Sequence, residues 1–231
     1  MVGWQEPRAG VARTAKGWNV YGTTGSQTEL RTDRGVAPDT SILGTAEQPR
    51  ARGTVARPPV PTGHRARHDD RDWVVYTRRI DRPVATVWDA LASAEARARW
   101  VGTSRPVDGS SGEFLFTFEG DDLLPMTYWL DHVEPGRSVG ISLRDPGAER
   151  SWRLEVDLLA EGDTTLLRVE QTIVNPAIAP WVEAGCEFYL DRLVAYLEGR
   201  DLHVHDYDEY FLSQAEHYRR LFPVQRRRVV D

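Results

Sequence analysis

The sequence has one cysteine in 231 residues and no long apolar run. A single cysteine excludes an internal disulfide bond and any zinc or iron–sulfur site built from several cysteines. A membrane-spanning helix needs roughly 18 consecutive apolar residues, and no stretch of this chain approaches that length. The first residues also lack the apolar run of a secretory signal. We therefore expect a cytoplasmic protein that does not associate with membranes.

Acidic residues and large apolar side chains are scarce in residues 1–68. This segment has five acidic against ten basic residues, so its charge of +5 contrasts with −11 for the rest of the chain. It holds nine of the 19 glycines and six of the 14 prolines, but only seven Ile, Leu, Met, Phe, Trp or Tyr residues. Such a composition buries too little apolar surface to offset the entropy lost on ordering. We predict a disordered basic extension over 1–68, a folded domain over 69–223 and a basic tail over 224–231.

The period of the apolar residues changes along the folded part. An initial strand is followed by two short helices and then by segments of alternating apolar and polar residues, which are typical of strands. From residue 178 the spacing becomes helical, and Gly199 is a natural helix end. The predicted elements are a strand over 73–80, helices over 84–91 and 94–100, strands over 112–119, 126–134, 137–143, 151–159 and 164–174, and helices over 178–198 and 208–221.

The short connections between the strands indicate an antiparallel sheet with one apolar face. That face needs a cover, and the helix over 178–198 is the only element long enough. We predict an α+β fold in which a curved sheet wraps around this helix and leaves a cavity where function should be sought. The helix over 208–221 carries too many aromatic residues to stay free, so we expect it to dock on the domain or on a second copy.

Several strings of the sequence resemble the START-like superfamily, whose architecture is called the helix-grip fold. Within it the closest likeness is to the family of activator of heat-shock-protein-90 ATPase homologues. The likeness covers roughly residues 70–199 and is carried by RIDRPVATVWDAL at 79–91, ARWVG at 98–102, VEPGR at 133–137, DTTLLRVEQ at 163–171 and GCEFYLDRL at 185–193. The family has no universal catalytic residues, so the resemblance implies a fold and a cavity rather than a reaction.

Alternation within the strands indicates candidate cavity walls. Gln171 is in phase with Val169, so it should face inward, bonded either to the nearby chain or to a ligand. Alternation leaves open which face of 126–134 is inner, that of Trp129 or that of Leu130. The expected ligand-binding residues are Phe116, Trp129, Trp152, Leu154, Val169, Gln171, Gly185, Phe188 and Tyr189.

No residue is predicted to be catalytic. Cys186 lies on the apolar stripe of the long helix, with no histidine near it in sequence, so core packing is favoured over a nucleophilic role. His203 and His205 lie close together, but no further ligand is indicated. We therefore expect no bound metal and no other cofactor.

These features together favour a protein that binds a small apolar or aromatic molecule as a carrier or sensor. The basic extension has no aromatic interleaving, so we expect no nucleic-acid binding. Two alternatives stay open. One is a co-chaperone-like regulator that binds heat-shock protein 90 and acts on its ATPase, and the other is an enzyme of the polyketide cyclase or dehydratase type.

Overall fold

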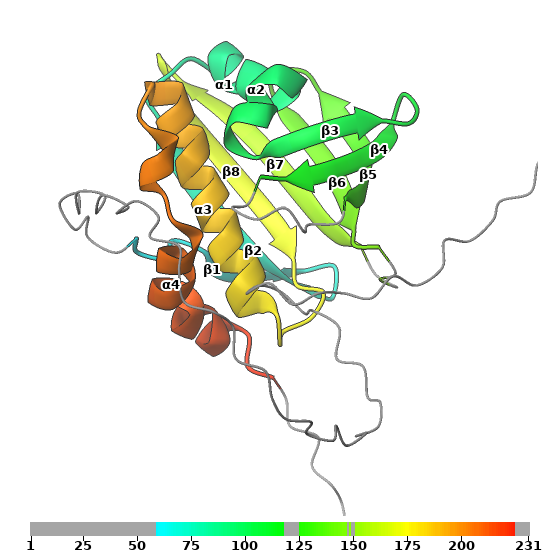
Figure 1. Ribbon diagram of the computed structural model, residues 1–231, viewed down its shortest axis with the longest axis vertical. Helices are drawn as coiled ribbons and strands as arrows, with labels where there is room; N and C mark the ends of the chain where they lie inside the picture. The colour runs from blue at the N-terminus through cyan, green and yellow to red at the C-terminus, as the bar shows by residue number, and fades with distance from the viewer. Residues whose placement is uncertain (1–58, 118–124, 147, 149–150, 225–231) are drawn as a thin grey trace, which may run out of the picture. The chain divides into compact units, whose positions relative to one another are not determined.

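The computed structural model describes residues 59–117, 125–146, 148 and 151–224. Within them, eight strands form one antiparallel sheet in the order β1-β2-β8-β7-β6-β5-β4-β3 (Figure 1). The strands are β1 (His64–His68), β2 (Arg71–Ile80), β3 (Gly102–Pro106), β4 (Ser111–Phe116), β5 (Met126–Glu134), β6 (Ser138–Arg144), β7 (Trp152–Glu161) and β8 (Thr164–Thr172). The helices are α1 (Val84–Ala92), α2 (Ala94–Trp100), α3 (Ala179–Glu198), the short 3-10 helix η1 (Leu202–Val204) and α4 (Tyr207–Leu221).

Helix α3 lies across one face of the sheet, and the core forms between them (Figure 1). Val74 and Ile80 of β2, Leu167 of β8 and Leu193 of α3 all belong to this core, and none is more than 1% exposed. Their burial removes apolar surface from water, which stabilises the fold. The arrangement confirms the predicted α+β helix-grip fold.

The ends of α3 follow from two residue types. Pro180 lies in its first turn, where the missing backbone N–H has no helical partner to lose. Gly199 adopts the left-handed conformation with φ 70°, and its N–H bonds to carbonyls of the last turn. Glycine takes this conformation without steric cost, so the helix ends where the sequence predicts.

Two strands of the sheet, β1 and β3, were not among the predicted elements. Both lie at sheet edges, and their exposed, polar sequences show no apolar alternation. β1 is joined to β2 by a two-residue turn in which Asp69 and Asp70 have φ values of 51° and 57°. This is the backbone of a tight hairpin turn, which aspartate tolerates better than most residues. β1 is therefore held by turn geometry and backbone pairing rather than by apolar burial.

The folded part also begins earlier than predicted. The backbone N–H groups of Thr62 and Gly63 donate to the carboxylate of Glu187, over 2.5 and 2.9 Å. The boundary predicted at residue 69 is therefore wrong, because polar residues before it join the fold through hydrogen bonds. The prediction of disorder otherwise concerns residues 1–58, which lie outside the described residues, as do 118–119 of the strand predicted over 112–119 and tail residues 225–231.

Helix α4 docks on α3 of the same chain. Its side chains Tyr210 and Tyr218 are buried. The ring of Phe211 stacks on that of Trp181 in α3, with centroids 3.6 Å apart, and the hydroxyl of Tyr207 donates to the carbonyl oxygen of Trp181. The aromatic residues that set this helix apart in the sequence thus form its contact with the domain.

Candidate functional site

The strand register shows which side chains face α3. Gln171 of β8 bonds to α3 and is paired with Leu154 of β7. Leu154 is paired in turn with Ile141 of β6, and Ile141 with Leu130 of β5. Directly paired residues on neighbouring strands project from the same face of a sheet. We call the face that carries these four residues the inner face.

The inner face is buried near β2 and β8 and partly exposed further along the sheet. Tyr76 of β2 and Val169 of β8 are 0% and 7% exposed. On β5, β6 and β7 the inner face carries partly exposed residues beside buried ones such as Leu143 and Val156. We call the partly exposed set the open apolar surface: Tyr128, Leu130, Val139, Ile141, Trp152 and Leu154. Large apolar side chains that share one accessible, concave face are typical of a binding surface.

Four polar side chains, the polar quartet, lie next to this surface. The hydroxyl of Tyr76 donates to one carboxyl oxygen of Glu183, and the amide nitrogen of Gln171 donates to the other over 3.3 Å. The thiol of Cys186 donates to the amide oxygen of Gln171 over 3.1 Å. Cys186 is only partly buried, whereas the other three side chains are buried. The quartet therefore runs from the core at Tyr76 to the accessible side at Cys186.

The polar quartet is uncharged at neutral pH. Burial raises the pKa of Glu183 to about 8, although its hydrogen bonds from Tyr76 and Gln171 oppose the shift. Burial also raises the pKa of the Cys186 thiol and the pKa of the Tyr76 hydroxyl well above their usual values. At pH 7 all three groups hold their protons, so the quartet offers hydrogen bonds without formal charge.

A second buried network, one turn further along α3, is charged. Glu187 accepts hydrogen bonds from Arg78, from the Tyr218 hydroxyl and from Thr62. Burial alone would raise the pKa of Glu187, but the Arg78 guanidinium and these hydrogen bonds lower it overall. Arg78 also donates to Asp191 over 3.0 Å. This network joins β2, α3, α4 and the start of the folded part, so its role is structural.

The structure brings together six of the nine residues expected to bind ligand. Gln171 makes its hydrogen bonds within the chain, which is the first of its two predicted roles. Phe116 and Tyr189 meet where β4 approaches α3, with ring centroids 5.2 Å apart. The six residues on the inner face or on the side of α3 that meets it are Phe116, Trp152, Leu154, Val169, Gln171 and Tyr189.

Trp129 lies on the opposite face, and its expected position is corrected. It is paired with Ser142, and the guanidinium of Arg144 lies 4.9 Å from its ring centroid. Because Leu130 faces inward, its neighbour Trp129 must face outward. Sequence alternation could not decide this, since both residues are large and apolar.

Gly185 and Phe188 face α4, which also differs from the expectation. A side chain at Gly185 would first meet the ring of Tyr207, 3.5 Å away. Phe188 packs edge-on against Tyr207 and Tyr210. The apolar stripe of α3 is wide because the helix is packed on two sides, against the sheet and against α4.

Sequence reasoning missed the buried acids of α3. Glu183, Glu187 and Asp191 follow one another at intervals of four residues, so they lie on one side of the helix. Opposite them, Tyr76 and Arg78 are alternate residues of β2 and share the inner face. The matching spacing of acids on the helix and donors on the strand was the available signal.

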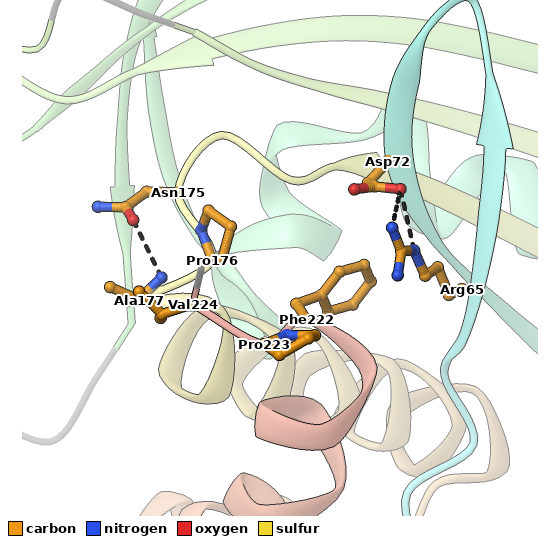
Figure 2. A pocket seen from close by; sticks show the side chains of 8 residues that line it. All are labelled: Arg65, Asp72, Asn175, Pro176, Ala177, Phe222, Pro223 and Val224. Carbon is orange, nitrogen blue, oxygen red and sulfur yellow. Dashed lines mark hydrogen bonds and ion pairs between the residues drawn. The ribbon is translucent and has the colours of Figure 1, made fainter. Parts of the chain in front are cut away.

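A separate surface pocket of about 420 Å³ lies at the end of α4 (Figure 2). Arg65 and Asp72 form an ion pair of 2.7 Å on one side, and the Arg65 guanidinium lies 5.6 Å from the Phe222 ring centroid. On the other side the Asn175 side chain accepts a hydrogen bond from the backbone of Ala177. The charged groups of this pocket already satisfy each other.

The two histidines considered as metal ligands lie around η1. The Nδ1 atom of His205 is 2.8 Å from the Tyr210 hydroxyl. Among the described residues, no group of three or more histidines, cysteines or acids is arranged to hold a metal ion. None of the helices described is both long and apolar enough to cross a membrane.

A curved antiparallel sheet around one long helix, with an apolar inner face, defines a protein of the helix-grip class. The chain belongs to the family described as Activator of Hsp90 ATPase homolog 1-like protein, whose family model matches residues 81–198. This match confirms the resemblance read from the sequence. Among curated proteins, no match to the chain was found.

Solved structures show the same architecture. The crystal structure of CalU16 from Micromonospora echinospora is 22% identical, with a TM-score of 0.56, and the match covers 70% of this chain and 96% of CalU16. The protein encoded by gene BPP1335 from Bordetella parapertussis is 21% identical, with a TM-score of 0.54 and coverage of 77% and 97%. DynU16, a putative protein in the dynemicin biosynthetic locus, is 24% identical, with a TM-score of 0.50 and coverage of 56% and 49%. At these identities the likeness concerns the fold alone.

Proposed function

We propose that this chain binds a small apolar or aromatic molecule on the open apolar surface and acts as a carrier or sensor in the cytoplasm. One observation carries the proposal: Leu130, Ile141, Trp152 and Leu154 face the helix side of the sheet and are only partly buried. A ligand that covers them removes apolar area from water, which is worth about 25 cal/mol per Å² before the costs of binding.

Binding without a reaction is the simpler account of this site. A general acid or base must come within hydrogen-bond reach of the substrate. Glu183 is 1% exposed, and both of its oxygens are bonded, to Tyr76 and to Gln171. We therefore assign it no catalytic role, and the cyclase or dehydratase alternative has no placed acid in its support.

Two statements about relatives bear on the proposal. DynU16 is described as a putative protein in the dynemicin biosynthetic locus, a setting that a small-molecule site would suit. The family description names the Hsp90 ATPase. No feature of the residues that the structure describes identifies a chaperone-binding surface, so we rank a regulator of that ATPase second. Co-precipitation with the chaperone would test that second reading.

A fluorescence titration with 1-aminoanthracene tests the proposal, because this apolar aromatic probe brightens when it leaves water. Trp152→Ala should weaken its binding about fivefold or more, since the indole is part of the open apolar surface. Trp129→Ala is the matched control, because it removes the same side chain from the opposite face, and its affinity should stay within about twofold. No binding to the unsubstituted protein, or equal loss in both variants, would refute the proposal.

A further inference from the structure

The open apolar surface has a polar border that points to the chemistry of its ligand. Gln171 of β8 is paired with Leu154 of β7, and Trp152 is the next inner-face residue along β7. Cys186 reaches Gln171 from α3 and is itself partly exposed, so it lies between the accessible side and the Gln171 amide, which is 3% exposed. A molecule lying on Trp152 and Leu154 would therefore meet the Cys186–Gln171 pair at one end.

This pair has unused hydrogen-bonding capacity. A side-chain amide offers two N–H donors and an oxygen with two lone pairs. In the described part of the chain, Gln171 uses one donor toward Glu183 and one acceptor position toward Cys186. The pair can therefore form a hydrogen bond with one more polar group, and a ligand that supplies this group should bind more tightly than one that does not.

The surroundings of the pair disfavour a charged ligand. Glu183, Cys186 and Tyr76 all hold their protons at neutral pH, so none of them neutralises an anion or a cation. The guanidinium of Arg78, two residues beyond Tyr76 on β2, is already engaged by Glu187 and Asp191. A charged group brought to this end would lose its hydration without gaining an opposite charge.

Resting on the function proposed above, we propose that the ligand is an apolar or aromatic molecule with one neutral oxygen, a carbonyl or a hydroxyl, which bonds to the Cys186–Gln171 pair. Its apolar body lies against Trp152 and Leu154. Gln171 and Cys186 thus act as specificity-determining residues, and carboxylates or amines of the same size are rejected.

Four naphthalenes of nearly equal size test the inference, each measured at pH 7 by displacement of 1-aminoanthracene. They are 2-acetylnaphthalene, the hydrocarbon 2-isopropenylnaphthalene, 2-naphthoate and 1-(2-naphthyl)ethylamine. The ketone should bind about fivefold more tightly than the hydrocarbon, as expected for one net hydrogen bond, and at least about tenfold more tightly than either charged compound.

Two variants test which side chains cause the preference for the ketone over the hydrocarbon. Gln171→Met keeps the length of the side chain but removes the amide, and should bring the ketone and the hydrocarbon to nearly equal affinity. Cys186→Ala removes the thiol that holds the amide and should reduce the preference. Ser142→Ala, on the opposite face, should keep the full preference. Equal binding of ketone and hydrocarbon by the unsubstituted protein, or a preference that survives both variants, overturns this inference alone. Binding of none of the four compounds or of the probe overturns the proposed function as well.

Discussion

Glu183 and Glu187 lie one turn apart on α3, each 1% exposed, yet they differ in charge at neutral pH. The partners of Glu183 are the uncharged Tyr76 and Gln171, so burial dominates and its carboxyl stays protonated. Arg78 reaches Glu187 and keeps it ionised. One helix thus presents a neutral acid behind the open apolar surface and a charged pair toward α4.

The protonation of Glu183 predicts a specific pH dependence. Its pKa is about 8 in the folded protein against an ordinary value of 4.5, so the folded state binds more protons and stability falls as pH rises from 4.5 to 8. Glu183→Gln mimics the neutral form and should stabilise the protein at pH 7, by up to about 3 kcal/mol. Urea unfolding of both proteins at pH 5 and pH 8 measures this. An identical decline in the two proteins would contradict the assignment.

The Arg78–Glu187 pair predicts a large cost for removing one partner. Both side chains are largely buried, so Glu187→Ala leaves the Arg78 guanidinium with Asp191 alone and removes the acceptor used by Tyr218 and Thr62. It should destabilise by about 3 kcal/mol. The pKa of Glu187 is lowered on folding, so its contribution is present above its ordinary pKa and is lost in acid. Glu161→Ala, which breaks the exposed pair with Arg79, is the control and should cost less than about 1 kcal/mol. Similar losses in both variants at neutral pH would refute the distinction.

We propose that the independently folding domain begins near residue 59 rather than at 69. A chain starting at Pro59 keeps β1 and the hydrogen bonds from Thr62 to Glu187. A chain starting at Asp69 loses both and should unfold at a clearly lower urea concentration, by roughly 2 kcal/mol or more. Equal unfolding midpoints for the two truncated chains would show that β1 contributes nothing.

Gly102, where α2 passes into β3, should tolerate no side chain. Its φ is 147°, and a Cβ there would lie 2.1 Å from the carbonyl oxygen of Leu115. Gly102→Ala should therefore cost at least about 2 kcal/mol in the free energy of unfolding. Gly109→Ala is the matched control, because nothing lies within 4 Å of the added methyl group, and its effect should stay within about 0.5 kcal/mol. A tolerated Gly102→Ala would mean that β3 pairs with β4 differently.

Most of the fold could be predicted, because the apolar residues of the central strands and of α3 recur at the spacing of a strand or of a helix. The edge strands β1 and β3 could not, since their polar side chains bury little and backbone pairing holds them. The face of Trp129 was likewise undetermined, because adjacent large apolar residues carry no alternation signal.

The buried acids were the harder part of the site to predict. A charged residue on a helix is usually solvated, and only its partners on another element reveal otherwise. For Glu183 and Glu187 those partners, Tyr76 and Arg78, lie 107 and 109 residues earlier in the chain. Their side-chain contact is a product of the tertiary fold, and the sequence shows only the matching spacing of the acids on the helix and the donors on the strand.

Methyl NMR of the full chain, titrated with 2-acetylnaphthalene, tests most directly whether a ligand binds on the inner face. Leu130, Ile141 and Leu154 carry methyl groups on the inner face, whereas Leu115, Leu159 and Leu166 carry them on the opposite face of the same sheet. A ligand on the inner face should produce shift changes and ligand contacts at the first set and none at the second. Changes confined to the second set, or no changes at either, would contradict a ligand site on the inner face.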